Sequence, residues 1–153
     1  MEKSNGIFSA IKSITPENFQ KYGVVLELPS DSEKKSRGES QFKVLTSQPH
    51  AGWRLAYLIV RNRTLQRLES HPLSMESFEP VRGVSLIIVA PKENPEKVET
   101  FVLDKPVVLY AGVWHDVLTL SEEAEIKITE NADIVTEYHN LKSEVVPNLC
   151  FKN

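Results

Sequence analysis

Apolar and polar residues alternate along this chain in short runs and do not follow a helical period. Runs rich in β-branched and aromatic residues recur about every 8 to 12 residues, separated by Pro, Gly, Asn or acidic clusters. Residues 125–128 read Glu, Ile, Lys and Ile, so this strand is expected to bury one face and expose the other. We expect strands at 24–28, 55–60, 64–69, 84–90, 99–103, 107–110, 114–120, 125–129 and 133–138.

The N-terminal part predicts one short helix and one loop. Thr15 followed by Pro16 is a helix-start signal, because proline at the first helical position gives up an amide that would be unpaired anyway. The helix is expected to run to Tyr22, with Gly23 as its C-terminal cap. Segment 30–40 is polar and aperiodic and predicts a solvated loop. These elements indicate an all-β barrel or sandwich with a short N-terminal helix.

Length and composition narrow the class of protein. The 153 residues suit one domain spanning 1–153. A net charge of -3 argues against a nucleic-acid partner. No apolar run reaches the roughly 18 residues of a membrane helix, so no membrane partner is expected. Cys150 is the single cysteine and cannot form an internal disulfide, and the N-terminus lacks the apolar core of a signal peptide, so we expect a cytoplasmic protein.

Two segments carry candidate chemistry. In RLESHPLSMESFEPVRG, the side chains of Arg67, Glu69 and His71 share parity and are expected on one face of a strand, and Glu76 follows after four intervening residues. The second segment, YAGVWH, ends on His115. Together the two glutamates and two histidines offer two oxygen and two nitrogen donors. This set suits a divalent Mn, Fe, Ni or Zn ion.

These segments resemble the two motifs of the cupin superfamily. The first motif has two histidines at alternate positions, then a glutamate and a glycine, and here Glu69 takes the place of the first histidine. Tyr110, Gly112 and His115 keep the spacing of the second motif. More closely, LESHPLSMESFEPVRG followed by LIIVAP resembles LERHPLxxQxFxPxxG and the next strand of the ureidoglycolate lyase family of cupins. The likeness extends to FQKYG, GVWH and the C-terminal LCF.

The resemblance implies a cupin-type jelly-roll β-barrel that cleaves ureidoglycolate to glyoxylate and urea in allantoin catabolism, as a homodimer. It implies that His115 or His71 supplies a base of near-neutral pKa, and that Glu76, with a pKa raised by burial, supplies an acid. It also implies a divalent metal held by Glu69, His71, Glu76 and His115, or no cofactor at all.

Several cationic residues of that family are absent here. Ser70 stands where LERHP has its arginine, and Asp116 stands where a second histidine follows the GVWH segment. Because the substrate is a carboxylate, another cation must bind it. We expect Arg61 in this role, with Arg54 and Arg67 as the alternatives.

The sequence leaves two other functions open. One is a noncatalytic cupin that binds a small molecule in a retained pocket, and the other is a metal-dependent cupin enzyme that acts on another small carboxylic acid. Tyr110 and Trp114 are candidate substrate contacts, with packing as their alternative role.

Overall fold

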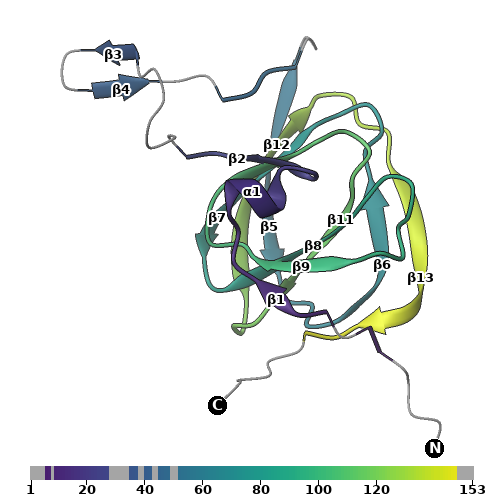
Figure 1. Cartoon of the computed structure of the whole chain (residues 1–153). Helices are drawn as coiled ribbons and strands as arrows, with labels where there is room; N and C mark the ends of the chain where they lie inside the picture. Colours follow the sequence, from purple (N-terminus) through teal and green to yellow (C-terminus); the bar gives the residue numbers. More distant parts are fainter. Residues whose placement is uncertain are drawn as a thin grey trace, which may run out of the picture.

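A computed structural model describes residues 6–7, 9–27, 35–37, 40–42, 45–48 and 52–147 of the chain (Figure 1). The expected all-β architecture with a short N-terminal helix is confirmed. None of the described helices is long and apolar enough to cross a membrane. The elements are β1 (Ile11–Lys12), α1 (Pro16–Phe19), β2 (Gly23–Val25), β3 (Lys35–Arg37), β4 (Ser40–Phe42), β5 (Trp53–Val60), β6 (Leu65–Ser70), β7 (Glu76–Arg82), β8 (Ser85–Ala90), β9 (Glu99–Val102), β10 (Val107–Leu109), β11 (Trp114–Thr119), β12 (Ala124–Asn131) and β13 (Glu137–Val145).

Two sheets face each other across a shared core, as expected of a jelly roll. The six-stranded sheet has the order β1-β9-β8-β11-β6-β13, and the five-stranded sheet has the order β2-β10-β7-β12-β5. Alternate residues of both sheets point inward, among them Ile87 and Val89 of β8 and Ile126 and Ile128 of β12. The hairpin of β3 and β4 is a separate two-stranded sheet that projects away from the barrel in Figure 1.

Helix α1 closes one side of this core. Thr15 caps the helix, because its hydroxyl accepts from the Asn18 backbone N–H while the Asn18 side chain accepts from the Thr15 N–H. Phe19 and Tyr22 pack edge-on against the Phe101 ring of β9, with centroids 5.3 and 6.0 Å away. The interior beside β8, β9, β2 and β10 is therefore filled with apolar side chains.

A second apolar cluster covers the opposite face of the six-stranded sheet. It contains Leu86 and Ile88 of β8, Leu118 of β11 and Leu68 of β6. A parallel bridge between Ile7 and Val145 joins the two edges of this sheet. The two faces of β11 therefore differ, because His115 and Val117 point between the sheets whereas Trp114 and Leu118 point to the second cluster.

The structure corrects four expectations about the elements. No strand was expected between 70 and 83, but residues 76–82 form β7, whose Pro80 sits where the pairing with β12 shifts register, a place that tolerates a missing N–H. The last strand was expected at 133–138 but spans Glu137–Val145, and the helix ends at Phe19 because the chain turns there. Within the predicted loop 30–40, the backbone of 35–37 pairs with that of 40–42.

Parts of three expectations lie outside the described residues. These are the rest of the loop at 30–40, the end of the first predicted strand at 28, and the LCF segment at 149–151.

Candidate functional site

At one level of the barrel, residues in register on neighbouring strands form a row across each sheet, and the two rows face each other between the sheets. In the five-stranded sheet the row crosses β5, β12, β7 and β10 through Arg54, Glu130, Glu76 and Leu109. In the six-stranded sheet it crosses β13, β6, β11 and β8 through Tyr138, Glu69, His115 and Val89. Side chains that are distant in sequence are thereby set opposite each other.

The exposed fraction of the residues rises along both rows, from the apolar side of the barrel toward edge strands β5 and β13. Glu76 and His115 are 5% and 2% exposed, whereas the Arg54 side chain is 51% exposed and Tyr138 is 58% exposed. Glu69 lies between these extremes. The buried ionisable groups therefore adjoin the apolar core on one side and reach solvent between edge strands β5 and β13 on the other.

His71 joins this group from the segment that follows β6. Its backbone carbonyl accepts a hydrogen bond of 2.9 Å from the Gly112 N–H. Gly112 has a φ of +84°, which a residue with a side chain rarely adopts, so the turn before β11 favours glycine at this position. The two motif segments are thus tied together by the backbone.

Both histidine rings are oriented through their Nδ1 atoms. His115 Nδ1 lies 2.9 Å from the Val113 carbonyl, and His71 Nδ1 lies 3.3 Å from the Val135 carbonyl and 3.2 Å from the Thr136 hydroxyl. A carbonyl only accepts, so each Nδ1 carries the proton and donates it. Each Nε2 is thereby turned toward the carboxylates, which is how metal-binding histidines are usually held.

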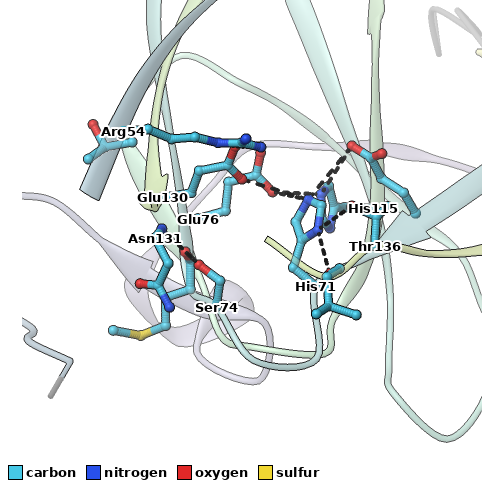
Figure 2. Close-up of polar contacts among 12 residues, drawn as sticks. Arg54, His71, Ser74, Glu76, His115, Glu130, Asn131 and Thr136 are labelled. Carbon is cyan, nitrogen blue, oxygen red and sulfur yellow. Dashed lines mark hydrogen bonds and ion pairs between the residues drawn. The ribbon is translucent and has the colours of Figure 1, made fainter. Parts of the chain in front are cut away.

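The Nε2 atoms converge on acidic oxygens (Figure 2). Glu76 Oε2 lies 2.9 Å from His115 Nε2 and 3.2 Å from His71 Nε2. Glu69 Oε1 lies 3.8 and 4.0 Å from the same two atoms. Glu130 Oε2 lies 3.8 Å from His71 Nε2. Three carboxylates therefore surround two imidazoles.

Among the described residues, three buried atoms of this group lack a hydrogen bond of good geometry: Glu76 Oε2, Glu130 Oε2 and His115 Nε2. The 2.9 Å approach of Glu76 to His115 is an ion-pair distance without the alignment of a hydrogen bond. The ligand atoms of Glu69, His71 and His115 all lie within 4.8 Å of one another, as do those of His71, Glu76 and Glu130. Such convergence of oxygen and imidazole donors fits a divalent cation.

Mutual pairing shifts the pKa values of these groups. Burial alone would lower the pKa of His115, but the Glu76 carboxylate raises it to about 9. Burial alone would raise the pKa of Glu76, but His115 and His71 lower it to about 2. The pKa of His71 is raised, since Glu76 outweighs burial. The expectation that burial raises the pKa of Glu76 is therefore wrong, because two imidazoles stabilise its ionised form.

A polar network holds the segment between β6 and β7 against β12. The Asn131 backbone N–H donates to the Ser74 hydroxyl at 3.1 Å, and the Asn131 side chain donates to the Leu73 carbonyl at 3.1 Å. Figure 2 shows Ser74 and Asn131 beside Glu130. The network fixes the chain between His71 and Glu76.

The structure does not bring every candidate to this group. Arg61 follows the far end of β5 and pairs with Glu123 at 2.9 Å. Trp114 lies on the opposite face of its sheet, where its indole N–H donates to the Lys92 carbonyl. Tyr110 is 39% exposed in the turn before β11, and no polar contact among the described residues joins its side chain to the histidines.

Arg67 lies nearer to the group than Arg61. It shares the face of Glu69 on β6, and its guanidinium stacks 4.4 Å from the centre of the Tyr138 ring. Both side chains are exposed at the open edge.

Sequence reasoning missed Glu130 as a member of the group and ranked Arg54 behind Arg61. Arg54 Nε donates to Glu130 Oε1 at 2.8 Å, and its Nη2 lies 2.7 Å from the same oxygen. A signal was present in the alternation of β12, since Ile126 and Ile128 face the core and Glu130 continues their parity. A carboxylate on the buried face of a strand requires a partner.

Comparison with known proteins identifies the family. The sequence model described as ureidoglycolate lyase matches residues 8–148. The chain belongs to the ureidoglycolate lyase family. It is 28% identical over 123 residues to a ureidoglycolate lyase of Agrobacterium fabrum, covering 71% of this chain and 74% of that protein. It is 37% identical over 76 residues to a ureidoglycolate lyase of Azotobacter vinelandii, covering 45% and 46%.

Similar solved structures are more distant. An S161A mutant of Bacillus subtilis oxalate decarboxylase gives a TM-score of 0.45 at 16% identity, covering 59% of this chain and 24% of that one. A cupin 2 domain-containing protein of Halorhodospira halophila gives 0.45 at 16% identity, covering 61% of each chain. This chain thus spans about a quarter of the decarboxylase.

Two departures from the ureidoglycolate lyase pattern lie away from the histidines. Asp116 has the parity of Trp114 and Leu118, which face the second apolar cluster. Ser70 has the parity opposite to Glu69 on β6 and is buried. Neither position points to the face that carries His115, so these two changes leave the convergent group intact.

Proposed function

We propose that this member of the ureidoglycolate lyase family cleaves ureidoglycolate to glyoxylate and urea. The observation that carries the proposal is the convergence of His71, His115 and Glu76, oriented by backbone hydrogen bonds, at the level where the barrel meets solvent. Family membership and two relatives named ureidoglycolate lyase support it.

The reaction needs one proton removed and one delivered. The carbon that bears the hydroxyl also bears a urea nitrogen, so loss of the hydroxyl proton forms the aldehyde carbonyl while the carbon–nitrogen bond breaks and its electron pair leaves with nitrogen. Urea departs once that nitrogen is protonated. An acid and a base within hydrogen-bond reach of the two atoms are therefore required.

The residues of the group suit these tasks. With a pKa of about 9, His115 holds a proton at neutral pH and is the proposed donor to the departing nitrogen. Glu76 stays ionised, because its pKa is about 2, and keeps that proton close to Nε2. Glu69 is the more exposed carboxylate on the same level and is the proposed acceptor of the hydroxyl proton. His71 orients Glu76 from its other side.

The same atoms fit a divalent metal, for which Glu69, His71, Glu76 and His115 are the proposed ligands. Mn, Fe, Ni and Zn match two imidazole and two carboxylate donors. Such an ion would lower the pKa of the substrate hydroxyl by acting as a Lewis acid. A proton and a metal ion would compete for the Nε2 lone pairs of His71 and His115. The test therefore includes the protein both without and with added metal.

The test is glyoxylate release from racemic ureidoglycolate, corrected for spontaneous decay, with the protein as purified, after chelation, and after adding each metal in turn. We expect release by the wild type and a loss of at least about 100-fold in His115→Ala, the usual contribution of a proton-transferring group. His139→Ala, on the opposite face of the sheet, is the matched control and should keep full activity. Absence of release under every metal condition would leave a small-molecule binder or an enzyme of another acid.

A second copy of the chain is the proposed partner. Strand β5 is a sheet edge that pairs only with β12 within the described residues, and one of its faces exposes Trp53, Leu55, Tyr57 and Ile59. A long apolar edge strand invites pairing with another chain unless it is covered. Pairing of two β5 strands across a two-fold axis would give the unpaired backbone N–H and C=O groups of both edge strands hydrogen-bond partners.

Light scattering coupled to gel filtration tests this proposal. The wild type should have about twice the 17.3 kDa mass of one chain. Leu55→Lys should shift the protein to the mass of one chain, whereas Val84→Lys, at an exposed valine outside β5, should not. A wild type with the mass of one chain would contradict the proposal.

A further inference from the structure

We propose that Arg54 binds the carboxylate of the substrate and that Glu130 positions Arg54 for this task. This inference rests on the proposed lyase function and names the cation that it requires. Arg54 lies on β5, in register with Glu130 of β12, which is in register with Glu76 of β7. One line of neighbouring side chains therefore leads from the solvent edge to the buried group.

Glu130 fixes the guanidinium from one side. Both contacts of Arg54, from Nε at 2.8 Å and from Nη2 at 2.7 Å, end on Oε1 of Glu130. A guanidinium has five N–H donors. Among the described residues, the Arg54 guanidinium makes no other hydrogen bond or ion pair, so donors remain for an anion between the sheets. Figure 2 shows Arg54 extending over Glu130 and Glu76 toward the histidines.

Glu130 also links Arg54 to the reacting groups. Its second oxygen, Oε2, is buried without a hydrogen bond and lies 3.8 Å from His71 Nε2. In a 2-hydroxy acid the hydroxyl carbon is bonded directly to the carboxylate carbon. A carboxylate held by Arg54 would therefore carry the hydroxyl toward His71 and the group around it, in which Glu69 Oε1 lies 4.0 Å from His71 Nε2.

The competing cations are less well placed. Arg61 comes seven residues later, beyond the far end of β5, which is about 20 Å along an extended strand. Its guanidinium pairs with Glu123 there. Arg67 lies across the open edge, stacked on Tyr138, and has no contact with the buried carboxylates among the described residues. Arg54 alone of these three arginines is joined to the buried group by an ion pair.

Binding and turnover are measured separately for wild type, Arg54→Gln, Arg54→Lys and Glu130→Gln. Calorimetric titration with glycolate, a 2-hydroxy carboxylate, is compared with titration by glycolamide, its neutral amide. We expect the wild type to prefer glycolate and Arg54→Gln to lose that preference by roughly ten- to a hundredfold, the strength of a charge-assisted pair. Arg54→Lys keeps the charge and should recover part of it.

Turnover kinetics separate an effect on KM from an effect on kcat, a distinction that a purely structural role of Arg54 would not produce. Arg54→Gln should raise the KM for ureidoglycolate far more than it lowers kcat, and Glu130→Gln should do so more weakly, because it loosens Arg54 without removing its charge. Arg63→Gln is the matched control, an exposed arginine that contacts the Ser121 carbonyl at the far end of the barrel. A larger KM for Arg61→Gln than for Arg54→Gln would overturn the inference.

The outcomes for the two proposals are distinguishable. Wild-type turnover with an unchanged KM in Arg54→Gln overturns the role of Arg54 and leaves the lyase function in place. A wild type without turnover whose glycolate preference depends on Arg54 overturns the lyase function and supports a carboxylate site. A wild type that does not prefer glycolate to glycolamide overturns the Arg54 site directly.

Discussion

The two halves of the barrel interior use the inward positions of the same two sheets for opposite purposes. Beside β8, β9 and β10, inward positions hold apolar residues such as Val89, Phe101 and Leu109, with α1 packed over them. One strand further along the same two rows, the inward positions hold Glu76 and His115. The apolar half stabilises the fold by burial, whereas the polar half places ionisable groups in a low-dielectric site.

Buried polar atoms that lack a hydrogen-bond partner also distinguish the polar half from the apolar half. Among the described residues, three of the four such buried atoms belong to Glu76, Glu130 and His115 and lie together. The fourth is the Thr100 hydroxyl, which lies apart on the far face of β9. An isolated orphan is a cost to stability, whereas a cluster of orphans indicates a site that binds something.

The largest expected effect is in the apolar half. Phe101→Ala removes the ring that contacts both Phe19 and Tyr22 and should lower the free energy of unfolding by about 3 to 5 kcal/mol. Denaturant titration measures this loss. Ureidoglycolate turnover by the fraction that stays folded should be nearly normal. Loss of turnover in folded protein would show that the two halves are coupled.

The second prediction concerns the polar half, where binding of a divalent metal should stabilise the folded protein. After chelation, adding Mn²⁺ or Zn²⁺ at a hundredfold excess over its dissociation constant should raise the free energy of unfolding by about 2.7 kcal/mol. His115→Gln should abolish the increase, which thermal denaturation detects. His139→Gln is the control, because His139 pairs with Glu96 on the opposite face of the sheet. An equal increase in both variants would place the metal elsewhere.

Much of the architecture was predictable because it depends on local alternation. The strand of β12 was expected at 125–129 and spans Ala124–Asn131, since its apolar residues recur at every second position. Strand β7 escaped prediction because Pro80 and two glutamates interrupt its apolar pattern, and Pro80 lies at a register shift in the pairing of β7 with β12 that spacing along the chain does not reveal. β13 was misplaced because it is an edge strand over most of its length and alternates weakly.

The site was predictable in part for a related reason. Glu69, His71, Glu76 and His115 stand in recognisable motifs, and the structure brings them together. The Arg54–Glu130 pair depends on register between strands that are 76 residues apart, which spacing along the chain does not reveal. Trp114 was named as a candidate substrate contact with packing as its alternative role, and it packs against the second apolar cluster, as its parity opposite to His115 indicates.

The Thr100 hydroxyl, the buried atom that lies apart from the group, allows a smaller effect, in which the substitution raises the free energy of unfolding. Thr100→Val keeps the β-branched shape and removes the buried hydroxyl that lacks a partner, so it should raise the free energy of unfolding by about 1 kcal/mol. Thr136→Val is the matched comparison, because the Thr136 hydroxyl contacts His71 Nδ1, and this variant should gain no stability. Denaturant titration of both proteins distinguishes an orphan from a functional hydroxyl. Destabilisation by Thr100→Val would mean that its hydroxyl has a partner.

The smallest expected effect concerns a carboxylate at the rim of the apolar half. Glu99 contacts Lys12 and Lys21 at 2.6 Å each and accepts from the Tyr22 hydroxyl, so it ties the N-terminal segment to β9. Burial alone would raise the pKa of Glu99, but the two lysines lower it below 4.5. A lowered pKa contributes stability that is fully present above pH 4.5 and is lost as the pH falls through the folded-state value.

Glu99→Gln should therefore cost up to about 1 kcal/mol of stability at neutral pH, with the loss shrinking as the solution is acidified below pH 4.5. Unfolding by denaturant at several pH values measures the difference between the two proteins. Glu79→Gln, which removes one ion pair with Lys127 and keeps an oxygen that can accept from the Ser77 hydroxyl, serves as the control and should have a smaller effect. A loss in Glu99→Gln that did not vary with pH would mean that Glu99 acts through packing of its side chain and not through its charge.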